Sequence, residues 1–336
     1  MTLTRPNAEV SDADEPARRR ATGRAVALLA LTALAALIPL LGPSAALDGT
    51  GEAAAPGAGG IALLRTVLFA ALCVPAGELF AARLARGVPG APLGDAPRSW
   101  APAAAVAGFV AALGLASVVA TGNLLPDQLS DMDIGSLYET REGKLALLEV
   151  NAFVVTGLCT LYRRPDLQVW PLAAVAVAEA LRAHPTTEYS PLVGSGLTLV
   201  HVVCAALWTG GLLHVLRMLR KWGPSEAGVA LLGLYARVAV VLFAALTTTG
   251  TWSALRRMPP GTVLDQLTTT AYGRTLLAKL LLVAVVAALA LSARLRLRGT
   301  ADPLGACSPA RAEVVALGVV VVVSGVLTAV PLPIRW

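Results

Sequence analysis

Few side chains in this chain are suited to binding a ligand, and two of them lie in one apolar stretch, LTLVHVVCAALWTGGLL at residues 197–213. His201 and Cys204 are three residues apart, so on a helix they share a face, together with Trp208. Imidazole and thiol together suit a soft ion such as Cu(I), and imidazole alone suits Cu(II). Equally, His201 would hydrogen-bond a neighbouring helix while Cys204 fills apolar space. The residues alone leave both interpretations open.

Two further side chains are candidate ligands on the same predicted side of the membrane as His201. His184 precedes the helix of His201, and the chain has only three histidines. Met258 lies in the segment RRMPPG and is one of four methionines. We therefore predict His201 and His184 as entrance ligands, with Cys204 or Met258 as soft assistants.

The composition is that of a membrane protein. Hydrophobic residues make up 56% of the chain, charged residues make up 14%, and the mean hydropathy is +0.69. Soluble domains carry about 25% charged residues. Because the apolar runs lack the alternation of barrel strands, we predict an all-α polytopic membrane helix bundle of about nine transmembrane helices. The predicted spans are 25–42, 61–82, 101–121, 145–161, 167–182, 195–216, 229–254, 274–293 and 312–330.

The distribution of lysine and arginine predicts the orientation. These residues gather in the N-terminal tail and after the second, fourth, sixth and eighth spans, and such segments stay cytoplasmic. We therefore predict a protein of the cytoplasmic (inner) membrane, with the N-terminus cytoplasmic and the C-terminus outside. The net charge of +6 follows from this topology, and we predict no nucleic-acid partner.

Two segments align without gaps and indicate an internal repeat. TREGKLALLEV begins at Thr140 and TAYGRTLLAKL begins at Thr270, so that Gly143 matches Gly273 and Glu149 matches Lys279. Residues around Arg65 likewise resemble those around His201. We predict two parallel four-helix repeats plus one N-terminal helix, retained rather than cleaved as a signal peptide. The predicted parts are a disordered cytoplasmic tail (1–24), a first helix and outer loop (25–60), a first repeat (61–182) and a second repeat (183–336).

Ionisable residues fall into two layers along the predicted spans. Glu149 and Lys279 belong to the outer layer with Arg65, Glu179 and His201, whereas Arg237 and Glu313 belong to the inner layer with Glu78 and His214. Unpaired charges inside a membrane are costly. We predict a salt bridge between Glu149 and Lys279 that stabilises the bundle and gates it. Whether the two layers are structural pairs or stations of an ion route stays open.

The stretch LVHVVCAALWTGGLL resembles the H-x₆-W-x-G-G signature of the copper resistance protein D (CopD) family of inner-membrane proteins. Further similarity follows in YARVAVVLFAALTTTG, TAYGRTLLAKLLL and RAEVVALGVVVVVSGVLTAVPLP, so the resemblance covers about residues 180–333 well and 61–165 more loosely. The family positions matched here are His184, His201, Trp208, Gly210, Gly211, Gly273, Lys279 and Glu313. Trp208, Gly210 and Gly211 are then expected to pack the helix. The chain lacks Met-rich or His-rich outer segments.

The resemblance implies copper uptake or copper handling across the membrane, with the copper ion as substrate or ligand and the lipid bilayer as surroundings. We predict no enzyme, because no Ser-His-Asp order, HExxH motif or phosphate-binding loop is present in the sequence. The alternative is a non-transporting factor that delivers copper to a partner cuproenzyme, or to a periplasmic or extracellular copper-binding protein. Transport needs polar stations through the bundle, whereas delivery needs only the outer ligands.

Overall fold

The protein is described here from a computed structural model. The structure describes residues 37–122, 133–162, 164–184, 190–223, 225–258, 260–299 and 307–333. The predicted tail (1–24) and most of the predicted first span lie outside the described residues.

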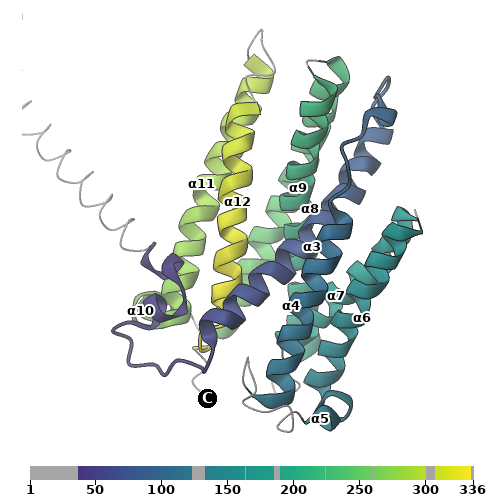
Figure 1. The fold of residues 1–336 in the computed structure, drawn as a ribbon. Coiled ribbons are helices and arrows are strands. Elements are labelled where there is room, and N and C mark those ends of the chain that lie inside the picture. The colour runs from purple at the N-terminus through teal and green to yellow at the C-terminus, as the bar shows by residue number, and fades with distance from the viewer. Residues whose placement is uncertain are drawn as a thin grey trace, which may run out of the picture.

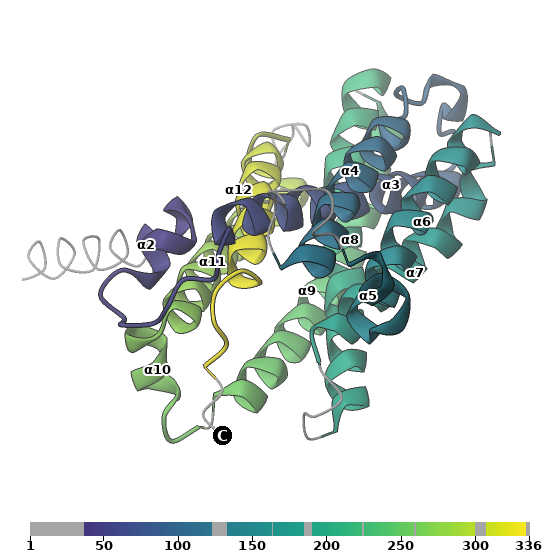
Figure 2. The same cartoon turned by 60° about the horizontal axis from the view of Figure 1, so that its bottom comes forward.

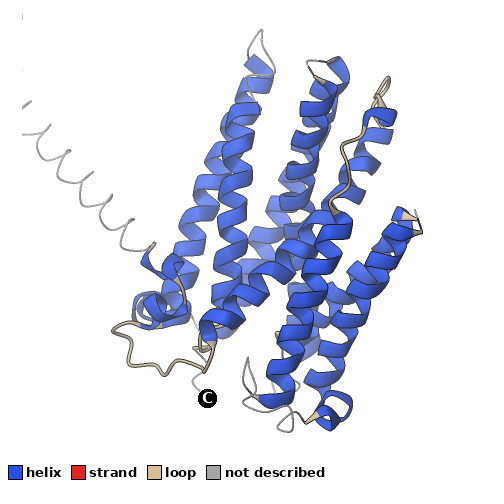
Figure 3. Ribbon diagram, viewed as in Figure 1, coloured by secondary structure: helices blue, strands red, loops and turns tan. Residues whose placement is uncertain are grey.

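The described part of the chain consists of helices and loops (Figure 3), as the apolar sequence predicts. Seven described helices are long and apolar enough to cross a membrane, so an all-α polytopic bundle is confirmed. These helices are α3 (Ala58–Arg86), α4 (Ala101–Thr121), α6 (Arg141–Leu161), α8 (Pro191–Trp222), α9 (Glu226–Arg257), α11 (Ala271–Gly299) and α12 (Cys307–Leu327). The predicted fifth span is α7 (Val169–Arg182), which has 14 residues and is shorter than a full crossing of about 20 residues. The predicted total of nine is therefore not established.

In the described ranges, six short helices precede or connect the long helices of the bundle. They are η1 (Ile38–Leu41), α2 (Pro43–Leu47), η2 (Leu93–Asp95), α5 (Ile134–Glu139), η4 (Pro165–Gln168) and α10 (Val263–Thr269). Figure 1 shows α5 and α10 at the bottom of the bundle, which we call the α5/α10 end, and the other end is called the opposite end. α2 and α10 both contact α11 (Figure 2), and the buried residues of the apolar cluster there include Met258 and Tyr272.

The helices follow the same order twice. The first half runs α3, α4, α5, α6, α7, and the second half runs α8, α9, α10, α11, α12. α3 packs along α8, while α7 packs on α8 and α12 packs on α3. These reciprocal contacts are those expected of two repeats related by an axis between α3 and α8.

Glycines allow α3 and α8 to approach closely where they cross. A Cβ atom at Gly210 would overlap the backbone carbonyl of Cys73, and one at Gly77 would overlap the backbone of Gly210. Small residues are the usual means by which membrane helices bring their backbones together. The crossing of α3 and α8 therefore joins the two halves directly.

The repeated sequence TxxG forms the same local structure in both halves. The Thr140 hydroxyl accepts a hydrogen bond from the Gly143 N–H (3.0 Å) and donates one to the Ser136 carbonyl (2.6 Å). The Thr270 hydroxyl likewise accepts from the Gly273 N–H (3.0 Å) and donates to the Gln266 carbonyl (2.7 Å). Each threonine thus caps a long helix and fixes the short helix before it.

Packing differs between the halves despite the common order. α4 packs along α6 in the first half, whereas the corresponding α9 and α11 barely touch. Among the seven long helices, α9 and α11 also have the smallest buried share of their most apolar stretch. The second half is therefore the more open of the two.

Candidate functional site

His201 lies on α8 and faces α9. Its Nδ1 atom lies 3.1 Å from the Thr249 hydroxyl oxygen, and its ring also contacts the position of Gly250, where a Cβ atom would approach Cε1 to 3.2 Å. The ring is half-buried. α8 therefore holds the imidazole against one turn of α9, and a glycine on that turn makes room for it.

The hydrogen bonds of Thr249 assign the tautomer of His201. The Thr249 hydroxyl donates its only proton to the Ala245 carbonyl, 2.7 Å away, so its oxygen accepts from His201 Nδ1–H. Nε2 then carries the lone pair, and the Leu246 carbonyl also lies close enough to interact with the ring. A histidine that binds a metal through one nitrogen typically donates the other N–H in this way. Thr249 was missed from the sequence, because the pairing of α8 with α9 could not be read there.

Cys204 and Lys279 are the other chemically distinctive residues of this region. Cys204 is a free, half-buried thiol that packs beside the apolar core of the second half. Lys279 on α11 is close enough to His201 to interact with it electrostatically. Within the described part of the chain, no group of three or more His, Cys, Asp or Glu side chains comes together as a metal centre.

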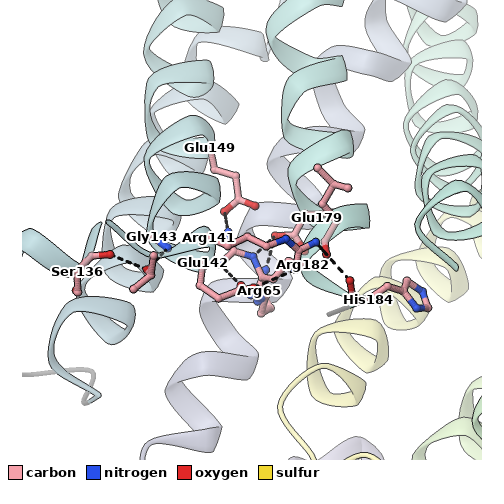
Figure 4. A network of polar contacts seen from close by, with 11 residues as sticks. Arg65, Ser136, Arg141, Glu142, Gly143, Glu149, Glu179, Arg182 and His184 are labelled. Carbon is pink, nitrogen blue, oxygen red and sulfur yellow. Dashed lines mark hydrogen bonds and ion pairs between the residues drawn. The ribbon is translucent and has the colours of Figure 1, made fainter. Parts of the chain in front are cut away.

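His184 is buried and packs against α8. Its Nε2 atom lies 2.9 Å from the Thr198 hydroxyl, and its ring fills the space left by Gly194. Figure 4 shows this ring pointing away from the nearby arginine and glutamate side chains. In this conformation Nε2 is engaged by the Thr198 hydroxyl.

Met258 is buried at the end of α9. It belongs to the apolar cluster that also includes Ala46, Tyr272 and Val330, whereas Cys204 packs against a different cluster. The structure therefore does not bring Met258 and Cys204 together in one site.

The first half contains a network of ion pairs at its α5/α10 end (Figure 4). Arg65 on α3 pairs with Glu179 on α7, and Arg182 on α7 lies 2.8 Å from Glu149 on α6. Glu149 is completely buried. Its carboxylate forms an ion pair with Arg182, and the Glu179 carboxyl also lies close to it.

The predicted Glu149–Lys279 salt bridge is wrong. Glu149 pairs with Arg182 because α6 packs on α7, whereas Lys279 makes no ion pair among the residues that the structure describes. The sequence does contain an indication that Arg182 is the partner of Glu149. Glu179 and Arg182 are three residues apart, and so share a face of α7 that turns toward α6 and α3.

Arginines also bind the carbonyls at the end of α7. Arg141 donates to the Leu181 carbonyl (2.6 Å), and Arg257 donates to the Ala183 carbonyl (3.1 Å). A helix leaves its last carbonyls without internal partners, and cations there are favourable. Because Arg257 comes from α9, this contact also ties the second half to the first.

Trp208 is at the centre of the second half. Its indole N–H donates to Glu313 on α12 (3.1 Å), and its carbonyl accepts from the Tyr235 hydroxyl (2.7 Å). Trp208 and Glu313 are both buried. Gly211 leaves room for the rings of Phe80 and Tyr235. These residues join α8, α9 and α12, and they extend the close packing at Gly210.

Among the described residues, the polar side chains of the inner layer do not line a continuous path for an ion. Several of them are instead engaged by other protein groups. Glu78 accepts from Arg217 (3.0 Å) and from the Trp100 N–H (2.7 Å), and Arg217 stacks 3.8 Å from the Trp100 ring. The Nδ1 atom of His214 lies 3.8 Å from Oε1 of Glu78. Arg237 is exposed on α9. The sequence missed Arg217 and Trp100 as partners of Glu78, because both belong to segments interpreted as cytoplasmic ends.

Fold and site together define a multi-pass helical membrane protein built of two similarly ordered halves, with an oriented histidine in the second. Residues 229–329 match the CopD family, described as copper resistance protein D, which confirms the resemblance over α9 to α12. The match begins after α8, so the segment from His201 to Gly211 lies outside it. No curated protein and no solved structure matches the chain.

Proposed function

We propose that this membrane protein takes up copper, or handles copper, at the cytoplasmic membrane without catalysis. The match of α9 to α12 to a family named for copper resistance supports the choice of metal. The observation that carries the proposal is the orientation of His201, whose Nδ1–H is held by Thr249 so that the lone pair lies on Nε2. Cys204, one helical turn away on α8, is the proposed soft assistant.

The α5/α10 end is proposed to be the outer side of the membrane. Several basic residues cluster at the opposite end of the bundle, and such clusters favour the cytoplasmic side. They include Arg83, Arg86, Arg220, Lys221, Arg294 and Arg296. Under this orientation the N-terminus is cytoplasmic, and His201 lies in the outer half of α8. His184 and Met258 would act as ligands only after leaving their present packing.

Cellular copper content tests the proposal. Cells expressing the unchanged protein are compared with cells expressing His201→Ala, at matched protein levels, by elemental analysis. Val200→Ala is the matched control, because Val200 is the neighbouring residue and is 45% exposed. Copper should rise with the unchanged protein and with Val200→Ala, but not with His201→Ala. An equal rise with His201→Ala would remove His201 as the ligand.

Copper delivery to a partner protein is the second candidate function. It is favoured by the inner layer, where Glu78 and Glu313 are engaged by Arg217, Trp100 and Trp208 rather than open to an ion. In this case the purified protein should bind copper through His201, while cellular copper should not change. The partner would be a periplasmic or extracellular copper-binding protein or a cuproenzyme. A rise in cellular copper that depends on His201 would contradict delivery as the sole function.

A further inference from the structure

Lys279 is a cation without a counter-charge inside a membrane-spanning helix. It lies about two turns into α11, and it makes no ion pair with any described residue. A charged side chain in the hydrocarbon region is costly unless it is paired or hydrated, so such residues commonly mark functional sites.

The equivalent position in the first half shows how this fold otherwise compensates a charge. Aligning the two TxxG segments places Glu149 opposite Lys279. Glu149 pairs with Arg182, and Arg65 pairs with Glu179, so each cation there has an anion from a neighbouring helix. The second half carries a charge of the opposite sign at this position but provides no acidic partner for it among the described residues.

The surroundings of Lys279 are suited to a ligand that supplies the missing anion. His201 lies within electrostatic reach, and with Nδ1–H held by Thr249 its lone pair lies on Nε2. α9 and α11 barely touch here, unlike α4 and α6 in the first half. A bare copper cation between His201 and Lys279 would be repelled by the ammonium group, because like charges in a medium of low dielectric constant repel strongly.

We propose that Lys279 is the counter-ion for an anionic ligand that arrives bound to the metal. The cargo is then a Cu(I) complex with chloride-like or thiolate ligands, rather than the bare cation. With chloride as the example, the Nε2 lone pair forms a Cu–N bond to CuCl₂⁻ as one chloride leaves. The remaining chloride stays on copper and faces the ammonium group of Lys279. No oxidation or reduction takes place. This inference rests on the proposed copper function of His201.

Copper(I) binding by the purified full-length protein in lipid nanodiscs tests the inference. Affinity is measured by competition with a chromophoric Cu(I) chelator, at fixed free copper activity and constant ionic strength, in either chloride or nitrate. The unchanged protein should bind at least about tenfold more tightly in chloride, since one charge pair formed away from water is worth at least this factor. Lys279→Met should lose this dependence, and Lys279→Arg should keep it.

Each of the other outcomes would contradict either the role of Lys279 or the proposed copper function. Tighter binding by Lys279→Met than by the unchanged protein, in both salts, would show that the cargo is the bare cation. Binding that depends on His201 but not on chloride would overturn the inference and leave the proposed function standing. No copper binding by the unchanged protein would overturn both. If Lys279→Met does not fold, the chloride dependence of the unchanged protein decides the question.

Discussion

The two halves of this protein use equivalent positions in different ways. In the first half, Arg65 and Glu149 are engaged by Glu179 and Arg182 on α7. In the second half, the same positions carry His201 and Lys279, and α9 and α11 barely touch. One half thus satisfies its buried charges internally, while the other half leaves a cation without an ion-pair partner among the described residues.

Under the proposed function, this difference would let the two similarly ordered halves serve two purposes. Buried ion pairs that are fully matched hold helices in register, because breaking one leaves an uncompensated charge. Unmatched polar groups cost stability, and in a membrane they persist mainly where they contact a ligand or water. We interpret the first half as the rigid support and the second half as the ligand-binding part.

The largest expected effect follows from breaking the ion pairs of the first half. Arg182→Met leaves Glu149 buried without its cation and should destabilise the protein by about 3–5 kcal/mol, the usual cost of breaking a buried pair. Thermal unfolding in detergent measures the loss. Adding Glu149→Gln to Arg182→Met should recover much of it. Lys279→Met is the matched change in the second half and should cost much less, and an equal loss would contradict the distinction between the halves.

A smaller effect is expected at the two TxxG glycines. A Cβ atom at Gly143 or at Gly273 would overlap the backbone of the preceding short helix. Each glycine-to-alanine change should therefore destabilise the protein by about 1–3 kcal/mol through overpacking. Gly318→Ala on α12 is the control, since nothing lies near its added Cβ atom. A loss at only one of the two glycines would weaken the structural equivalence of the repeats.

The smallest effect on stability is expected at Thr249. Thr249→Val removes the acceptor that holds His201 Nδ1–H and should weaken copper binding by about 10–100-fold, as is typical of residues that orient a metal ligand. Unfolding should hardly change. Thr247→Val is the control, because Thr247 is exposed on the same helix and its hydroxyl bonds only the Phe243 carbonyl. Unchanged copper affinity in Thr249→Val would mean that Thr249 does not position the imidazole.

Much of the fold could be predicted from the sequence, because apolar length alone identifies membrane helices. The predicted span 101–121 coincides with α4, and the predicted 145–161 falls within α6. The pairing of charges could not be predicted in the same way. The partner of Glu149 depends on which helix packs against α6, and Arg182, the last residue of the predicted span 167–182, was assigned no partner.

The candidate site was only partly readable for a similar reason. The unusual setting of His201 is visible in the sequence, but its orientation depends on Thr249, which is 48 residues away. His184 and Met258 have ligand chemistry, yet the structure buries one beside Thr198 and the other in an apolar cluster. Residue type therefore identified the candidate ligands, whereas only the packing distinguished His201 from His184 and Met258.

Copper retention by the purified protein tests the contrast between the halves most directly. The unchanged protein, His201→Ala and an Arg65→Met/Glu179→Gln double variant are loaded with Cu(I), passed through gel filtration and analysed for copper. The double variant removes one ion pair of the first half, Arg65 with Glu179, without leaving either partner as a lone charge. The pair of Glu149 with Arg182 remains. The unchanged protein and the double variant should retain copper, and His201→Ala should not. Retention by His201→Ala, or loss in a folded double variant, would contradict the assignment of binding to the second half.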